Sequence, residues 1–165
     1  MNLVSYTTDW SQLFQKEKNN LTSLLGSEAV DVQHIGSTAI PGIASKPIVD
    51  IIVLLPSFQD ALKYIDRLQE LGYEYSEERS STERHFFTKG EPVTVHLSLT
   101  DRSTSYWDRQ IIFREYLLHH PDAAKEYEAL KRSLIQRYPE GREEYSSGKS
   151  EFISIVLKKA GFSAQ

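Results

Sequence analysis

The feature that most constrains the fold of this chain is a short apolar run, residues 47–55, that contains a single charge. The run is rich in isoleucine and valine, which is typical of a central β-strand covered on both faces. Asp50 lies inside it. A carboxylate buried alone is strongly unfavourable, so Asp50 needs a cation, a metal or several hydrogen-bond donors beside it. The sequence therefore predicts a sheet whose central strand carries an acid that another group must stabilise.

Residue periodicity elsewhere predicts an α+β fold with a mixed sheet, flanking helices and a helical C-terminal tail. We expect helices over residues 9–25, 57–71, 105–118, 121–138 and about 143–159. We expect strands over residues 30–35, 47–55, 84–89 and 93–100. Whether a further strand joins the last two stays open. Asp9 and Ser57 have residue types that cap helix starts, Gly26 and Gly72 can end helices, and residues 90–92 predict a hairpin turn.

The length of 165 residues fits a single domain, residues 1–165, in which residues 1–100 hold the sheet and residues 101–165 form the tail packed on it. The absence of cysteine excludes a disulfide framework, a thiol nucleophile and a cysteine zinc site. With 23 acidic and 19 basic residues the net charge is −4, so we expect no nucleic-acid partner. No apolar stretch has the length of a membrane span and the start of the chain lacks a signal-peptide pattern, so we expect a cytoplasmic protein.

The segment between His34 and Asp50 holds most of the candidate site residues. Gly36 and Ser37 follow a predicted strand, and such a turn presents backbone N–H groups and a hydroxyl that suit phosphate oxygens. Lys46 precedes the buried strand, close enough to neutralise a bound anion. Taken singly, a Gly-Ser turn is ordinary and a buried Asp is often structural. The spacing is the stronger argument, because the turn and Asp50 fall on consecutive strands that would meet at one edge of the sheet.

The hairpin supplies further candidates. Strand alternation places Arg84 and Phe86 on the face opposite His85, so only one of the two sets can face the site. Arg84 can bind an anion, or it can form a salt bridge with Asp50 or a surface glutamate. His96 can be a metal ligand, a general base or an ordinary hydrogen-bonded residue of the sheet.

Three basic residues of the predicted tail are assigned a structural role. Arg114 and Lys131 lie in helices rich in charge, where solvated or paired side chains are the default. Lys149 follows a Ser-Ser-Gly sequence and could reach across from the last helix, but we assign it to structure as well.

Two strings of residues in this region carry a resemblance. Residues 34–42 read His-Ile-Gly-Ser-Thr-Ala-Ile-Pro-Gly, and residues 46–51 read Lys-Pro-Ile-Val-Asp-Ile. A Gly-Ser turn followed by an acid in an apolar strand opens the nucleotidyltransferase superfamily signature, and the fuller strings resemble the GrpB family within it. The likeness covers nearly the whole chain and continues at residues 113–117, 120–121, 124, 127, 130–131, 149 and 152–153.

The resemblance implies a nucleotidyltransferase-like sheet and a phosphate site formed by Gly36, Ser37, Thr38, Lys46 and Arg84. Active members of the superfamily hold two divalent metals between acids on neighbouring strands, because two metals and a polyphosphate require several anionic ligands.

This sequence departs from that plan in its acids. Asp50 matches the first acid, but Ile52 occupies the position of the second and His96 the position of the third. We therefore assign Asp50 and His96 as the catalytic candidates and Asp50 as the metal ligand, for one Mg²⁺ or Mn²⁺ shared with substrate phosphates.

These residues lead to two hypotheses of function. The first is a protein that binds a nucleotide or another phosphate-bearing small molecule and transfers a nucleotidyl group. The second is a catalytically inactive binding or accessory domain, which the family's fusion to dephospho-coenzyme A kinase links to coenzyme A metabolism. The first is the leading hypothesis. Ile52 favours a non-classical or inactive site, whereas the presence of Asp50 in an apolar strand argues against an inactive domain unless Asp50 stabilises the fold.

Overall fold

The structure, a computed structural model, describes residues 1–163. Its helices are α1 (Asp9–Leu25), α2 (Ile65–Glu70), α3 (Tyr106–His119), α4 (Pro121–Arg137), α5 (Arg142–Ser147) and α6 (Ser150–Lys159). Its strands are β1 (Asp31–Ile35), β2 (Val49–Leu54), β3 (Tyr73–Ser76), β4 (His85–Lys89) and β5 (Val95–Thr100). Short 3₁₀ helices occur at Gly26–Glu28, Ser37–Ala39 and Phe58–Tyr64.

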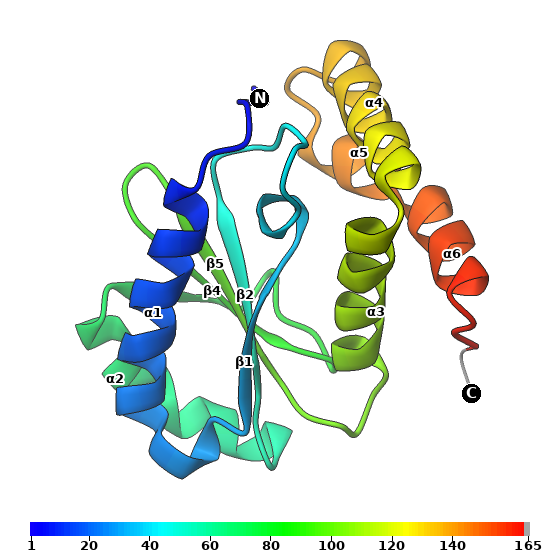
Figure 1. The fold of residues 1–165 in the computed structure, drawn as a ribbon. Coiled ribbons are helices and arrows are strands. Elements are labelled where there is room, and N and C mark those ends of the chain that lie inside the picture. Colours follow the sequence, from blue (N-terminus) through cyan, green and yellow to red (C-terminus); the bar gives the residue numbers. More distant parts are fainter. Residues whose placement is uncertain (164–165) are drawn as a thin grey trace.

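The five strands form one mixed sheet in the order β1-β2-β5-β4-β3 (Figure 1). β2 and β5 run parallel, and every other neighbouring pair runs antiparallel. The predicted hairpin is confirmed as β4 and β5, and the strand that the sequence left open is the edge strand β3. The register places Asp50 between Ile35 at the end of β1 and His96 on β5. The sheet therefore brings the glycine turn, the acid and the histidine to one place.

Helices cover both faces of the sheet (Figure 1). α1 and α2 pack over residues 49, 51 and 53 of β2, and α3 packs over Ile52 and Leu54 through Tyr106 and Trp107. Because successive side chains of a strand point to opposite faces, β2 carries an apolar core on each side. This burial confirms the prediction of a central strand and explains its nearly continuous apolar sequence. Asp50 alternates in step with Ile52 and Leu54, so its side chain points to the same face of the sheet, the one that α3 covers.

The C-terminal helices pack beyond α3, on the side of the sheet away from α1 (Figure 1). Their core includes Ile40 and Ile43 of the loop between β1 and β2. The single helix expected over residues 143–159 is wrong, because it divides into α5 and α6 at Gly148 and Lys149. A Cβ on Gly148 would lie 2.4 Å from Leu134 Cδ2, so glycine permits close packing on α4 where its helix propensity is poor. The break places Lys149 in a turn.

Two predicted helix caps are absent from the structure. Asp9 is the first residue of α1, and Ser57 makes no capping hydrogen bond with its side chain. The backbone N–H of Phe58 donates instead to Asp101 Oδ2 at 2.6 Å. Asp101 follows β5, so a tertiary acceptor replaces the local cap. The helix predicted over residues 57–71 begins as a 3₁₀ helix before α2, and its apolar residue Leu62 is exposed.

Within residues 1–163, none of the helices has the length and apolar character needed to cross a membrane.

Candidate functional site

The end of β1 is a glycine turn that touches Asp50. Gly36 has φ 73° and ψ −175°, a backbone conformation that is essentially restricted to glycine. A Cβ at this position would lie 2.4 Å from Asp50 Oδ2. The prediction that the turn and the acid meet at one edge of the sheet is therefore confirmed.

Asp50 finds its partner on the neighbouring strand. Its Oδ1 lies 3.1 Å from His96 Nδ1, and since an ionised carboxylate can only accept, Nδ1 carries the shared proton. The expectation that Asp50 is buried is wrong, because 37% of its side chain is exposed, compared with 19% for His96. An ion pair with Lys46 or Arg84 does not form within residues 1–163. Asp50 is consequently open to an adjoining cavity.

Helix α4 holds the loop that carries Lys46. The N–H of Ala44 donates to Glu128 Oε2 at 3.0 Å, and its carbonyl accepts from Lys131 Nζ at 2.7 Å. Lys131 is buried, so the structural role expected for it agrees with its position. Arg114 is likewise engaged with the backbone, since its Nη1 donates to the His34 carbonyl at 2.9 Å. From the tail, Lys131 thus fixes the loop between β1 and β2, and Arg114 fixes the end of β1.

Asp50, His96 and Ser37 open onto one cavity of about 220 Å³, called the cleft below. Its walls carry four cations (Lys46, Arg79, Arg84 and Lys149), Asp50, His96, three serines (Ser37, Ser45 and Ser146), Ile48 and two aromatic rings (Phe86 and Tyr145). The cleft lies between the sheet and the tail, because α5 and the turn after it form one wall. Four positive side chains face one carboxylate, so the cleft is cationic in a chain whose net charge is −4.

Each aromatic ring of the cleft is contacted by two of these cations. Lys46 Nζ and Lys149 Nζ lie 3.8 Å and 4.5 Å from the centroid of the Tyr145 ring. On the other wall, the guanidinium carbons of Arg79 and Arg84 lie 4.0 Å and 4.4 Å from the centroid of the Phe86 ring. Cations over aromatic faces are stabilised by the ring quadrupole. The rings therefore position the charges without neutralising them.

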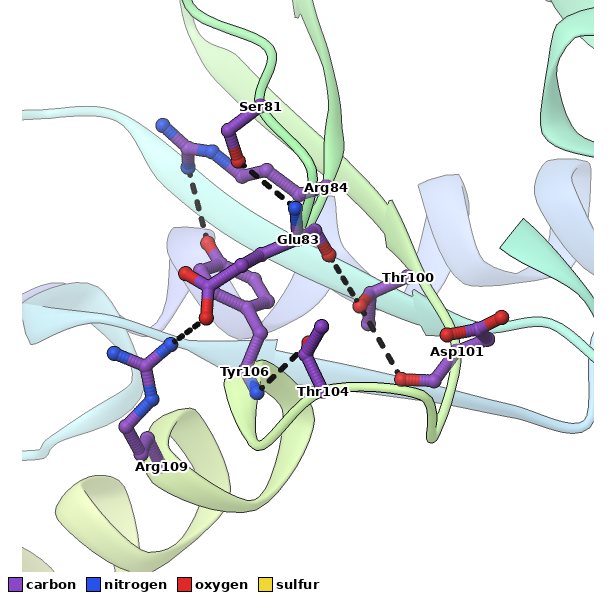
Figure 2. A network of polar contacts seen from close by, with 8 residues as sticks. All are labelled: Ser81, Glu83, Arg84, Thr100, Asp101, Thr104, Tyr106 and Arg109. Atoms are coloured by element: carbon purple, nitrogen blue, oxygen red, sulfur yellow. Dashed lines mark hydrogen bonds and ion pairs between the residues drawn. The ribbon is translucent and has the colours of Figure 1, made fainter. Parts of the chain in front are cut away.

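Arg84 is held by hydroxyl groups and not by a carboxylate. Its Nη1 donates to the Tyr106 hydroxyl at 3.0 Å and to Ser98 Oγ at 3.4 Å, and Figure 2 shows its other terminal nitrogen pointing away from this network. Glu83 pairs with Arg109 instead (Figure 2). Within residues 1–163 the salt bridge that the sequence left open for Arg84 is not formed. The positive charge of Arg84 remains available to an anion.

The structure changes the membership of the predicted site at four positions. Gly36, predicted to bind phosphate, adjoins Asp50 but does not itself line the cleft. Lys149, which the sequence assigned to structure, lines the cleft, and so does Arg79, which was not a candidate. Arg79 lies in an irregular polar loop before β4, where no periodicity indicates its direction. Thr38 does not line the cleft, because it is buried and its Oγ1 lies 2.9 Å from His34 Nε2.

Burial and mutual repulsion weaken the basicity of the cleft lysines. Desolvation, followed by the positive charge of Lys149, lowers the pKa of Lys46 to about 8, while Asp50 acts in the opposite direction. Desolvation also lowers the pKa of Lys149, again opposed by Asp50. Burial, followed by the Asp50 charge, raises the pKa of Tyr145 to about 12, so its hydroxyl is neutral. Asp50 thus helps to keep the lysines charged.

The donor set does not fit a metal held by the protein alone. Asp50 is the one carboxylate on the cleft wall, and four cations surround it. Ile52, at the position of the second acid, is fully buried against α3. Across residues 1–163 no cluster of three or more His, Asp or Glu residues could hold a metal ion. Two metals need several anionic oxygen ligands, so Asp50 alone does not supply the ligand set of a two-metal site among residues 1–163.

A larger groove exists near the start of the chain but lacks this chemistry. It lies between residues 1–4 and α4, with a volume of about 470 Å³. Arg132 is the one charged side chain on its wall, and it is already paired with Glu128. The cleft remains the candidate site.

Comparison with known proteins decides the family. The profile of the GrpB family, described as GrpB protein, matches residues 1–159. The chain belongs to the GrpB family. The glutamate-rich protein GrpB of Alkalihalophilus pseudofirmus is 35% identical over 163 residues, covering 95% of this chain and 94% of that protein. A solved structure of conserved protein GrpB from Enterococcus faecalis superposes with a TM-score of 0.87 at 30% identity, covering 96% of each chain.

Several GrpB-family relatives are longer than this chain. A UPF0157 protein of Pseudomonas aeruginosa is 36% identical over 156 residues, covering 92% of this chain but 64% of that protein. A protein of Mycolicibacterium paratuberculosis named dephospho-CoA kinase is 28% identical over 189 residues, covering 96% of this chain and 45% of its own length. In such relatives the GrpB segment is part of a larger protein.

Less similar solved structures share the nucleotidyltransferase fold. A GLD-2/RNP-8 complex superposes with a TM-score of 0.59 at 13% identity, covering 93% of this chain and 50% of that chain. Terminal uridylyl transferase 4 from Trypanosoma brucei with bound UTP superposes with a TM-score of 0.54 at 14% identity, covering 96% of this chain and 52% of that chain. At these identities the likeness shows the fold alone, and it confirms the nucleotidyltransferase-like α+β architecture expected from the sequence.

Proposed function

We propose that this chain binds a nucleotide or another phosphate-bearing small molecule in the cleft, through its cations and not through metal ions held by the protein. The observation that carries the proposal is the convergence of Lys46, Arg79, Arg84 and Lys149 on one cavity, with none of the four paired to a carboxylate in residues 1–163. Such cations repel one another at close range, and an anion between them relieves that repulsion. Positive charge in a cleft also raises the local concentration of anionic ligands.

Neutral donors support phosphate as the anion. Ser37, Ser45 and Ser146 place hydroxyl groups on the same walls, and a hydroxyl can donate to a phosphate oxygen. The two guanidinium groups of Arg79 and Arg84 have the fork geometry that suits phosphate. In this proposal His96 keeps Asp50 in place, and Asp50 keeps the cleft lysines charged.

Nucleotidyl transfer is not part of this proposal. The reaction in active nucleotidyltransferases depends on metals held by acids, and Ile52 and His96 replace two of those acids here. Binding without that chemistry needs only the cations that are present. In this proposal Mg²⁺ or Mn²⁺ enters the cleft only as a counter-ion of the ligand.

An accessory role in coenzyme A metabolism is a second candidate, and one observation favours it. The mycobacterial relative named dephospho-CoA kinase contains a segment similar to this whole chain within a longer protein. Coenzyme A carries phosphate groups, so it would use the same cations. The binding of coenzyme A is measured in the same titrations as the binding of nucleotides.

Removal of Lys149 tests the proposal. Hydrogen bonds to charged groups contribute about 1.5–3 kcal/mol, so Lys149→Met should weaken the binding of ATP or coenzyme A roughly 10- to 100-fold. The measurement is calorimetric titration of the purified protein in low salt, with thermal unfolding of each variant as a check on folding. Lys159→Met is the matched control, because it removes the same charge from an exposed position near the end of α6.

The control should bind within twofold of the wild type. Equal affinities for all three proteins would place the ligand outside the cleft and overturn the proposal. Failure of ATP, coenzyme A and inorganic triphosphate alike to bind the wild type would overturn it as well.

A further inference from the structure

The size of the cleft limits how much of a ligand it can enclose. Its volume is about 220 Å³, whereas pockets that bury a whole drug-sized ligand have roughly 300–1,000 Å³. A complete nucleotide would extend beyond the walls. The part of the ligand that the cleft holds is therefore a small and strongly charged group.

The aromatic rings of the cleft are closed to a nucleobase. A base is commonly bound by stacking on an aromatic face. Phe86 and Tyr145 are only 2% and 4% exposed, and two cations contact each ring. A base could stack on either ring only by displacing charges that bind the phosphates. Stacking and phosphate binding therefore compete for the same surface.

The cleft also lacks side chains that read the edge of a base. Asn and Gln, which pair with base edges through both a donor and an acceptor, are absent from its walls among residues 1–163. The neutral polar groups are the three serines, whose rotating hydroxyls accept many partners. The cleft walls can therefore attract the negative charge of the phosphates, but they have no side chains that distinguish one base from another.

The balance of charge favours more than one phosphate group. The four lysine and arginine side chains outnumber the single carboxylate by three among the described residues of the walls. A phosphate monoester carries about −1.5 to −2 at neutral pH, which leaves the walls positive, whereas linked phosphates supply the remaining charge. The cations also come in two pairs, Lys46 with Lys149 and Arg79 with Arg84, each at its own ring.

We infer that the cleft recognises a diphosphate or triphosphate group by its charge and does not discriminate between the bases attached to it. The inference rests on the proposed function, because it names the ligand chemistry of the same site. The organic part of the ligand lies outside the cleft. The cleft then makes the same contacts with a nucleoside triphosphate as with free inorganic triphosphate.

Calorimetric titrations of the wild-type protein with a panel of phosphates test this inference. The panel is orthophosphate, pyrophosphate, inorganic triphosphate, ATP, GTP, CTP, UTP and adenosine, all in EDTA at one ionic strength. The four nucleotides and inorganic triphosphate should bind within about threefold of one another. Orthophosphate should bind at least tenfold more weakly, and adenosine should not compete with ATP.

The outcomes separate this inference from the proposed function. If one nucleotide binds at least tenfold more tightly than the other three, or if adenosine competes, the inference is overturned while phosphate binding stands. If no member of the panel binds, both fail. Phe86→Leu adds an independent readout, since the loss of a support for the two arginines should weaken inorganic triphosphate and ATP by the same factor. A loss confined to ATP would show stacking on the ring and contradict the inference.

Discussion

Replacement of Gly36 by alanine should destabilise the protein by about 3 kcal/mol and weaken triphosphate binding at least tenfold. Two effects combine at this residue. Its backbone conformation is essentially restricted to glycine, which for another residue costs about 1–3 kcal/mol. The new Cβ would also lie 2.4 Å from Asp50 Oδ2, so either the turn or the acid must move. Movement of the turn displaces Ser37 from the cleft wall, and movement of Asp50 shifts the carboxylate that faces the cleft cations. Chemical denaturation gives the free energy of unfolding, and titration gives the affinity.

Gly42→Ala is the matched control. Gly42 also has a positive φ of 89°, but a Cβ there would find open space. This variant should carry the backbone strain alone, about 1 kcal/mol, and bind triphosphate like the wild type. If both variants lose the same stability and neither loses affinity, the contact between Gly36 and Asp50 does not shape the site.

Replacement of Glu17 by alanine should cost about 3–5 kcal/mol of stability without changing ligand affinity. Glu17 lies on the buried face of α1, on the side of the sheet away from the cleft. It accepts a 2.6 Å hydrogen bond from the Tyr73 hydroxyl and pairs with Lys89 at 2.9 Å. The substitution leaves a cavity, an unpaired lysine and an unpaired hydroxyl in the core. The measurement is again chemical denaturation, at two protein concentrations.

A double variant separates the charge effect from the packing effect. Glu17→Met with Lys89→Met removes both charges and keeps apolar volume, so it should lose less stability than Glu17→Ala. Tyr73→Phe should lose about 1 kcal/mol, the amount typical of one hydrogen bond. A loss below 1 kcal/mol for Glu17→Ala would mean that the network contributes little to the fold.

The fold could be predicted from the sequence because its strongest signals are physical necessities. The apolar run around Asp50 is short and rich in β-branched residues, which favours a strand with two covered faces, and residues 90–92 favour a tight turn. The errors arose where tertiary contacts replaced local preference. Asp101 supplies the acceptor that Ser57 was expected to provide, and Gly148 breaks a helix by packing on Leu134.

The site could be predicted only where its residues lie on regular elements or in a recognisable string. Ser37, Lys46, Asp50, Arg84 and His96 meet these conditions, and all of them line the cleft. Two further cations of the cleft were not predicted, for different reasons. Arg79 lies in an irregular loop, and Lys149 reaches the cleft only because the last predicted helix is broken. A local sequence pattern does not show that the tail folds back to close a wall of the site.

Titration of inorganic triphosphate into the wild type and into Asp50→Asn, in EDTA and then in Mg²⁺, tests most directly whether cations rather than a protein-held metal bind the anion. Removal of the Asp50 charge removes a repulsion of the ligand, and the bound phosphates take over from Asp50 as the negative charge that keeps Lys46 and Lys149 protonated. The variant should therefore bind in EDTA at least as tightly as the wild type, while thermal unfolding confirms that it is folded. Binding that requires Mg²⁺ in the wild type, and that disappears in a folded Asp50→Asn, would contradict the account and restore Asp50 as a metal ligand.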